Sequence, residues 1–405
     1  MDAQIAVVGA LDTKGAEFSF LCERIRAAGG RPLLIDFGVL GDPEIQADVT
    51  AQEVARAGGG DLDAMRQERH KDYCMRTMSA GLRAVVRSLF DEGRLQGIIG
   101  MGGSGGTSIA TSAMRALPVA VPKLMVSTVG GGNVSAYAGT KDITFMPSVV
   151  DVAGLNQLSR DIYANAAGAI VGMVHRAPVE AEAVERPIVA ASMFGNTTQA
   201  VDGARKIFEA RDLEVLVFHA TGVGGRTMED LIASGYISAS FDLTTTELAD
   251  CVCGGVFDAG PERCLAAAQA GVPTVLVPGC VDMANFGGRA TVPAQYQNRL
   301  LYEWNPDITL LRTNAEENRK MGQMIAQAAN ASTGPVEILL PLKGVSMLDA
   351  PGEMFWDPEA DAACFDAIRE YLKPGIPLRE LDLNINDPEF ARAAAERLLA
   401  LLVGS

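Results

Sequence analysis

The sequence lacks the features that mark membrane-spanning, disulfide-rich and nucleic-acid-binding proteins. No apolar run reaches the roughly 18 residues of a membrane span, and residues 1–4 lead into a predicted strand without the regions of a signal peptide. The seven cysteines are odd in number and have no framework spacing, which predicts reduced thiols in a cytoplasmic protein. The net charge is −16 without a long basic run, which argues against a general binder of nucleic acids or anionic membranes.

The sequence contains enough apolar chain for two domains. Its 405 residues are 48% hydrophobic and 21% charged, and this length exceeds one ordinary core and fits two domains of about 200 residues each. A strand pattern at residues 5–10, a helical spacing at 18–28 and a second strand at 32–36 form one strand–helix–strand unit. Such units build parallel sheets with right-handed crossovers. We therefore predict an α/β fold with two Rossmann-like domains and mainly parallel sheets.

An internal repeat supports the division into two domains. The pattern of the first strand returns at residues 188–193, and the same offset carries Asp36 onto His219. This self-similarity predicts related domains at residues 1–180 and 187–405. Paired domains of this design place ligands in the cleft between them, at the carboxyl ends of the strands.

Weaker matches continue the repeat with changed offsets. The glycine pair 102–103 resembles the pair 254–255, and the segment 142–144 resembles the segment 307–309. The order of these matches is the same in both halves of the chain. We place the boundary between the domains near residues 177–187.

The stretch from residue 97 to residue 113, GIIGMGGSGGTSIATSA, is the most informative part of the sequence. A short apolar run, a turn with five glycines and a segment able to start a helix follow one another, as in an anion-binding loop. Gly100, Gly102 and Gly105 satisfy G-x-G-x-x-G. A dinucleotide site should have an acidic residue about 20 positions further on, and none is present. This absence weighs against a nicotinamide cofactor.

The same stretch also resembles a phosphate loop. Gly100, Gly105 and Thr107 keep the spacing G-x-x-x-x-G-x-T, but Gly106 stands where the lysine of that loop belongs. We predict binding of a phosphate, with the positive charge supplied by another segment. A glycine turn that only allows close packing of helix and strand is the alternative.

Further candidates in the first half follow other predicted strands. Residues 12–14 are predicted as a loop in which Lys14 supplies the missing charge, or is only solvated. Asp36 ends a strand and is a candidate for a ribose hydroxyl or a magnesium-bound water, or for hydrogen bonding to its own turn. A second ligand loop, or a plain turn, is predicted at Gly131, Gly132 and Asn133.

The second half offers candidates for catalysis. His219 ends a strand beside several glycines, a position suited to proton transfer or metal binding, and a structural histidine is the alternative. Arg226 is a candidate for holding an anionic substrate group. Cys280 and Asp282 follow another strand in the sequence PGCVD, where catalytic thiol, ligand loop and plain turn remain open.

Several motifs in one order resemble a known family. LDTKGAE, GMGGSGGT, TVGGGN, FHATGVGGRTME, VPGCVDMANFGG and PLKGVSMLDAPG are similar to the ATP-binding domain family of the tomato tobamovirus-resistance protein and its bacterial relatives. The resemblance implies two Rossmann-like subdomains, homodimers or higher homo-oligomers, and nucleotide binding. Carried over onto the matching positions, it implies nucleotide loops at Thr13, Lys14, Gly102, Gly103, Ser104, Gly105, Gly106, Thr107, Gly131, Gly132 and Asn133.

These observations together lead to one expected function. We expect a cytoplasmic enzyme that uses ATP and Mg²⁺ on a small organic or sugar acid, by phosphoryl transfer or ligation. The alternative is a non-catalytic module in which ATP binding drives sensing or inhibition. The second set of polar residues at strand ends favours the enzyme, because a sensor of ATP alone would not need it.

Overall fold

The computed structural model describes residues 4–68, 70–176 and 186–403. The chain divides into two compact units, residues 1–181 and 182–405, and each unit is described by itself. The predicted boundary falls mostly on residues 177–185, which lie outside the described part. Within the described ranges, no helix combines the length and the apolarity that crossing a membrane requires. All seven cysteines are described and unpaired.

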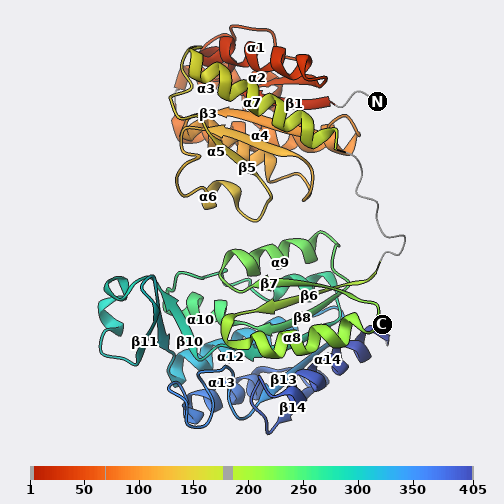
Figure 1. Ribbon diagram of the computed structural model, residues 1–405, viewed down its shortest axis with the longest axis vertical. Coiled ribbons are helices and arrows are strands. Elements are labelled where there is room, and N and C mark those ends of the chain that lie inside the picture. Colours follow the sequence, from red (N-terminus) through yellow and green to blue (C-terminus); the bar gives the residue numbers. More distant parts are fainter. Residues whose placement is uncertain (1–3, 69, 177–185, 404–405) are drawn as a thin grey trace. The chain divides into compact units, whose positions relative to one another are not determined.

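The N-terminal unit alternates strands with helices (Figure 1). Its strands are β1 (Gln4–Gly9), β2 (Arg31–Asp36), β3 (Gly97–Gly102), β4 (Lys123–Ser127) and β5 (Thr144–Pro147). Its helices are α1 (Leu11–Ala27), α2 (Ala51–Ala57), α3 (Leu62–Glu68), α4 (Lys71–Asp91), α5 (Ser104–Met114), α6 (Ser135–Ala138) and α7 (Gln157–Val174).

The five strands form one sheet in the order β2-β1-β3-β4-β5, and every pair is parallel. Helices cover both faces: α1 and α7 pack on one core, and α2, α4 and α5 pack on the other. The central strands β3 and β4 are buried along their whole length, as expected for a parallel sheet covered on both sides. Because β1 leads to α1 on one face and β3 leads to α5 on the other, the topological switch point lies between these two strands.

The C-terminal unit repeats this design and adds to it. Its strands are β6 (Ile188–Met193), β7 (Glu214–His219), β8 (Ala239–Thr244), β9 (Thr274–Gly279), β10 (Met283–Phe286), β11 (Leu301–Asn305), β12 (Ile308–Arg312), β13 (Val336–Pro341) and β14 (Leu378–Leu381). Its helices are η1 (Gly195–Thr197), α8 (Thr198–Glu209), α9 (Val223–Ala233), α10 (Thr246–Cys253), α11 (Leu265–Ala270), η2 (Arg289–Thr291), η3 (Ala294–Tyr296), α12 (Ala315–Asn330), α13 (Pro358–Tyr371) and α14 (Pro388–Val403).

Six of these strands form a parallel sheet in the order β14-β13-β9-β8-β6-β7. Read from its other edge, with these six strands numbered in chain order, the sheet has the order 2-1-3-4-5-6. The N-terminal sheet has the order 2-1-3-4-5, so the two sheets match and the C-terminal one has an additional edge strand. Helices α8 and α14 pack on one face, and the helices from α9 to α13 pack on the other. The remaining strands form an antiparallel sheet, β10-β12-β11. The α/β fold with two Rossmann-like, mainly parallel domains is therefore confirmed.

The two sheets show whether the residues matched by the internal repeat occupy equivalent positions. Asp36 and His219 are the last residues of β2 and β7, which occupy the same place in the two sheets, as predicted. The two weaker matches are wrong. The glycine pair 254–255 follows α10 rather than a strand, and residues 308–309 lie in β12 of the antiparallel sheet instead of matching β5. The second match fails because it lies in the segment between β9 and β13, which has no counterpart in the first half and breaks the offset.

The predicted loop at residues 12–14 is also corrected. Helix α1 begins at Leu11, and only Lys14 leaves helical geometry, with φ −140° and ψ 26°. The helix starts early because the carboxylate of Asp36 accepts a hydrogen bond from the Leu11 amide (3.0 Å), which satisfies one of the free N–H groups of the first turn. Thr13 and Lys14 therefore lie in the first turn of a helix.

Candidate functional site

The N-terminal unit carries an open helix start at its switch point. Helix α5 begins at Ser104 directly after β3, and no side chain caps it at Gly103. Ser104 is exposed, and Gly105 and Gly106 are half-buried. No described residue accepts a hydrogen bond from the amides of these three residues. We call residues 103–106 the amide cradle, because its free N–H groups and the positive end of the helix dipole favour an anion.

Two of the predicted loop glycines are explained by packing alone. A Cβ atom built on Gly100 would lie 2.9 Å from the Cβ of Ala110, and one built on Gly102 would lie 3.2 Å from the Cα of Gly106. Both positions bring β3 close to α5. The packing alternative from the sequence therefore applies to these two glycines.

The glycines of the amide cradle are different. A Cβ on Gly103 would meet nothing closer than 3.8 Å, one on Gly105 nothing closer than 4.0 Å, and one on Gly106 nothing closer than 3.7 Å. These are ordinary contact distances, and none of the three residues has a positive φ. Neither packing nor backbone conformation requires glycine here. The open space in front of the amides is instead consistent with room for a ligand.

The second predicted loop lies at the end of the next strand. Gly131, Gly132 and Asn133 are exposed after β4, and the Thr128 amide donates to the Gly102 carbonyl (3.2 Å), which ties this loop to the end of β3. The Asn133 side chain accepts from the Ser135 amide (3.0 Å). This loop therefore borders the amide cradle and leaves its own surface open.

Other predicted residues of this unit are engaged within the protein. Thr107 is fully buried, and its hydroxyl lies 2.7 Å from that of Ser127. Asp36 accepts from the Leu11 and Gly38 amides (3.0 and 2.8 Å), and burial raises the pKa of its carboxyl group. Lys14 donates to the carbonyl of Val152, and Thr13 is exposed. Thr107 and Asp36 thus hold the ends of the strands together.

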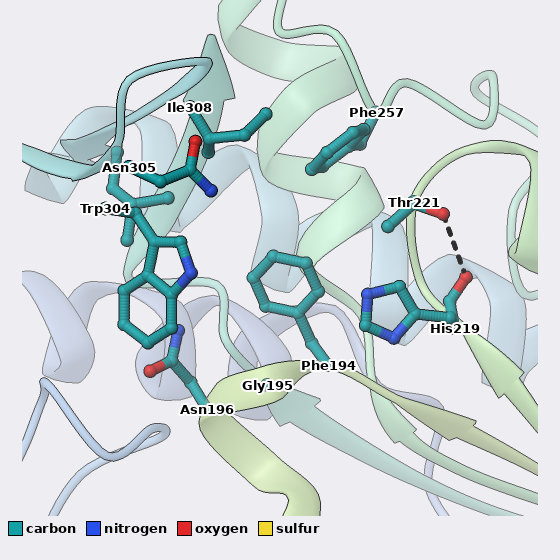
Figure 2. A pocket seen from close by; sticks show the side chains of 10 residues that line it. Phe194, Gly195, Asn196, His219, Thr221, Phe257, Trp304, Asn305 and Ile308 are labelled. Carbon is teal, nitrogen blue, oxygen red and sulfur yellow. Dashed lines mark hydrogen bonds between the residues drawn. The ribbon is translucent and has the colours of Figure 1, made fainter. Parts of the chain in front are cut away.

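The C-terminal unit contains a cavity of about 210 Å³, which we call the aromatic pocket (Figure 2). Its lining consists of Phe194, Gly195, Asn196, His219, Thr221, Phe257, Trp304, Asn305, Ile308 and Leu310. The ring centroids of Phe194 and His219 lie 5.5 Å apart, and those of Phe194 and Phe257 lie 6.2 Å apart in an edge-to-face arrangement. The pocket lies at the carboxyl ends of β6 and β7, beside the antiparallel sheet.

His219 is the predicted catalytic residue that the fold brings to this pocket. Its carbonyl accepts from the amide and hydroxyl of Thr221 (2.8 and 3.2 Å). A Cβ on Gly224 would lie 1.8 Å from this carbonyl oxygen, so glycine is required there to let α9 approach. No described residue hydrogen-bonds to the imidazole nitrogens of His219. The backbone is thus held in place while the ring stays available for a ligand.

A buried ionic network supports the turn that carries His219. Arg263 is fully buried and bonds to Asp242 (2.6 Å) and Glu247 (2.7 Å), and Glu247 in turn accepts from the Gly222 and Gly225 amides (2.6 and 3.0 Å). Burial by itself lowers the pKa of Arg263, but the charges of Asp242 and Glu247 outweigh it and raise that pKa. The network therefore fixes the β7–α9 turn beneath the pocket.

The other predicted catalytic residues do not line the aromatic pocket. Arg226 is exposed and donates to the Asp258 carbonyl (2.7 Å). Cys280 and Asp282 are fully buried, and burial raises the pKa of the Cys280 thiol well above its ordinary value. A buried thiol of this kind is inert as a nucleophile. The interpretation of Cys280 as a catalytic thiol is therefore corrected, because the chain packs it into the core.

Asp282 belongs to a second buried cluster. It accepts from the Ser346 hydroxyl (2.8 Å), and Arg312 pairs with Asp361 (2.8 Å) and Asp349 (3.4 Å) nearby. Burial raises the pKa of Asp282 to about 7, assisted by the charge of Asp349. Among the residues that the structure describes, no three His, Cys, Asp or Glu side chains converge as metal ligands would.

Sequence reasoning missed the aromatic walls of the pocket. Phe194 directly follows β6, and Trp304 lies in β11, yet aromatic residues at such places usually serve a core. The position of Phe194 was the available signal for a pocket residue. Phe194 follows the end of β6, and His219 ends the neighbouring strand β7. Trp304 reaches the pocket through the antiparallel sheet, which no repeat in the sequence predicted.

Comparison with known proteins assigns both units to one family. The model of the uncharacterised protein family UPF0261 N-terminal domain matches residues 3–178, and that of its C-terminal domain matches residues 186–402. A UPF0261 protein of Clostridium tetani is 45% identical over 99% of this chain and 100% of its own length. One from Rhizobium meliloti is 44% identical over 96% of this chain and 97% of its own length.

The resemblance to the tomato protein is confirmed as well. ToMV resistance protein Tm-1(GCR237) of Solanum lycopersicum is 40% identical over 330 residues, which are 80% of this chain and 44% of the tomato protein. Among solved structures, a UDP-N-acetylglucosamine 2-epimerase aligns with 99% of this chain and 96% of its own at 10% identity, with a TM-score of 0.25, a likeness too low to bear on function. The chain therefore belongs to the UPF0261 family, together with bacterial relatives of its own length and part of the tomato ToMV resistance protein.

Proposed function

We propose that this protein binds a nucleoside triphosphate of the ATP type through the amide cradle and acts on a second small molecule in the aromatic pocket. One observation carries the first part. The glycines at the start of α5 leave free amides facing open space at the switch point, where doubly wound sheets bind their ligands. The family resemblance drawn from the sequence supports the same ligand.

The charge balance of the chain suits recognition by dipoles. With a net charge of −16, the protein has no general attraction for anions, and the amides and the helix dipole supply a local one. Lys14 lies in the first turn of α1, the helix that follows β1, and β1 is the neighbour of β3. We propose that it adds the formal charge that the phosphate loop lacks at Gly106.

We propose that magnesium binds together with the nucleotide. Among the described residues, no three acidic, histidine or cysteine side chains converge as metal ligands, and Mg²⁺ in nucleotide sites is held largely by phosphate oxygens and water. We therefore propose that the metal is carried by the ligand. Self-association and a ligand cleft shared by the two domains, both expected from the sequence, stay predictions.

An enzyme is favoured over a sensor by the free imidazole of His219 in a second pocket. A histidine with both nitrogens available can move a proton during phosphoryl transfer or ligation. The acidic substrate expected from the sequence is less well supported, because Arg226 lies outside the lining and the lining has no lysine or arginine. A sensing or inhibitory module remains the alternative, and it would bind nucleotide without consuming it.

Thermal unfolding tests whether the protein recognises the phosphates of the proposed nucleotide. At a Mg-ATP concentration of about 100 times Kd, mass action adds about 2.7 kcal/mol to the stability of the folded state. For a unit of this size that should raise the melting temperature by about 5–10 °C. AMP should give little shift because it cannot fill a polyphosphate site, whereas tripolyphosphate should reproduce much of the ATP effect. Equal shifts by ATP and AMP would point to recognition of the base and count against the amide cradle.

A further inference from the structure

We infer that the aromatic pocket binds an uncharged, planar ring compound with a hydrogen-bonding substituent. This inference deepens the proposed function, since it names the class of the second ligand and rests on that proposal for the ligand being a substrate. The binding itself depends on the pocket alone. Its test therefore uses no nucleotide, so the two proposals can fail separately.

Three aromatic side chains from separate segments shape the cavity (Figure 2). Phe194 follows β6, Phe257 follows α10, and Trp304 lies in β11. Figure 2 shows Trp304 and Phe257 on opposite sides of the labelled group, with Phe194 between them. Aromatic faces attract flat rings by stacking and edge-to-face contacts. Walls of this kind favour a flat molecule over a bulky one.

The composition of the lining favours an uncharged ligand. No Lys, Arg, Asp or Glu is among the residues that line the cavity, and its polar side chains are those of Asn196, His219, Thr221 and Asn305. A charged ligand would lose its hydration without gaining a counter-charge. The volume of about 210 Å³ is enough for a small ring. A neutral ring avoids this loss of hydration.

Polar groups at the wall supply the hydrogen bonds. Asn196 is only 2% exposed. Within the part of the chain that the structure describes, its Oδ1 has no hydrogen-bond partner, while its Nδ2 has the weak acceptor sulfur of Met283 (3.3 Å). A buried acceptor without a partner costs free energy. Together with the free imidazole of His219, this amide fits a ring that carries a hydroxyl or an N–H group.

The exposure of Trp304 also supports a binding site for a planar ring. The side chain is 43% exposed, and its indole ring packs edge-to-face with Tyr302 at 6.2 Å between centroids. A large aromatic residue left accessible beside an apolar cavity is the composition expected of a binding site. Trp304 is therefore the residue whose removal should affect ring binding most without disturbing the core.

Saturation-transfer NMR on the full chain with matched small probes tests the inference. Phenol and cyclohexanol share a hydroxyl and differ in planarity, and benzoate keeps the aromatic ring but carries a charged carboxylate in place of the hydroxyl. We expect phenol to bind at least fivefold more tightly than either of the other two. Trp304→Ala should weaken phenol binding at least fivefold. Tyr236→Ala, which removes a residue of similar exposure (49%) outside the lining, should leave it unchanged.

Two results would overturn the inference. Cyclohexanol binding as tightly as phenol would show that the pocket does not select planar rings, and unchanged phenol binding in Trp304→Ala would show that the probe binds elsewhere. Circular dichroism checks that Trp304→Ala folds. Should it not fold, fluorescence of the Trp356→Phe variant, in which Trp304 is the one remaining tryptophan, decides the question. Phenol should then change its emission more than cyclohexanol does, and equal changes would contradict the inference.

Discussion

Replacing Arg263 by leucine should lower the free energy of unfolding of the C-terminal unit by about 3–5 kcal/mol, the usual loss when a buried ion pair keeps one partner. The guanidinium group bonds to Asp242, Glu247 and Glu229, and leucine would leave these carboxylates without their cation. Urea denaturation followed by circular dichroism measures the change. The variant should also loosen the turn that carries His219, because Glu247 holds the Gly222 and Gly225 amides.

An exposed arginine provides the matched control. Arg369 pairs with Asp366 and Glu380 (2.5 and 2.7 Å), but these side chains are in contact with solvent, where an ion pair contributes about 1 kcal/mol or less. Arg369→Leu should therefore leave the denaturation midpoint almost unchanged. Equal losses in the two variants would mean that burial does not determine the effect of Arg263.

The protein should be less stable at pH 9 than at pH 6 because of the cluster around Arg312. Burial and the charge of Asp349 raise the pKa of Asp361 to about 8, and burial raises that of Asp282 to about 7. The folded state thus keeps protons that the unfolded chain loses near its ordinary pKa of about 4. The stabilisation is complete below that ordinary pKa and is lost as the pH rises through 7 and 8.

Urea denaturation at the two pH values measures this dependence. We expect a loss of at least about 1.4 kcal/mol, the equivalent of one pKa unit. Asp361→Asn should reduce the loss, because the amide has no proton to release. Asp366→Asn removes an exposed carboxylate instead and should leave the loss unchanged, which separates the cluster from general repulsion in an acidic protein. A stability that rises from pH 6 to pH 9 would contradict the assignment.

The sequence was sufficient to predict the fold because buried parallel strands leave a strong local signal. The strands β1, β2 and β6 are short runs rich in apolar residues, and each lies where the pattern placed it. The antiparallel sheet was missed for the opposite reason. Strand β11 reads LYEWN and is partly exposed, so it lacks the buried apolar run on which the other strand predictions rested.

The candidate site was predictable only where backbone chemistry determines it. The amide cradle depends on glycine and on a strand followed by a helix, which are both visible in a sequence, and His219 was found because it ends a strand. The role of Cys280 depends on burial by β13 and the segment after it, where its amide donates to the Val345 carbonyl (2.9 Å). Contacts between segments so distant in the chain cannot be inferred from spacing. For the same reason, the sequence did not reveal that Arg263 and Arg312 form buried ion pairs.

Removal of a single amide donor tests the amide cradle most directly. Ser104 is the first residue of α5, after an extended Gly103 with φ −76° and ψ −168°. Proline is well tolerated at the first position of a helix and after an extended residue, so Ser104→Pro deletes one N–H group without breaking the helix. Gln157→Pro makes the same change at the start of α7, where the side chain of Asn156 already caps the helix.

Isothermal titration calorimetry of Mg-ATP into the full chain makes the decisive measurement. We predict one site per chain in the wild type and in Gln157→Pro, and an affinity about tenfold or more weaker in Ser104→Pro, since a hydrogen bond to a charged group contributes about 1.5–3 kcal/mol. Absence of binding to the wild type, or equal affinity in all three proteins, would contradict the assignment of the amide cradle as a triphosphate site.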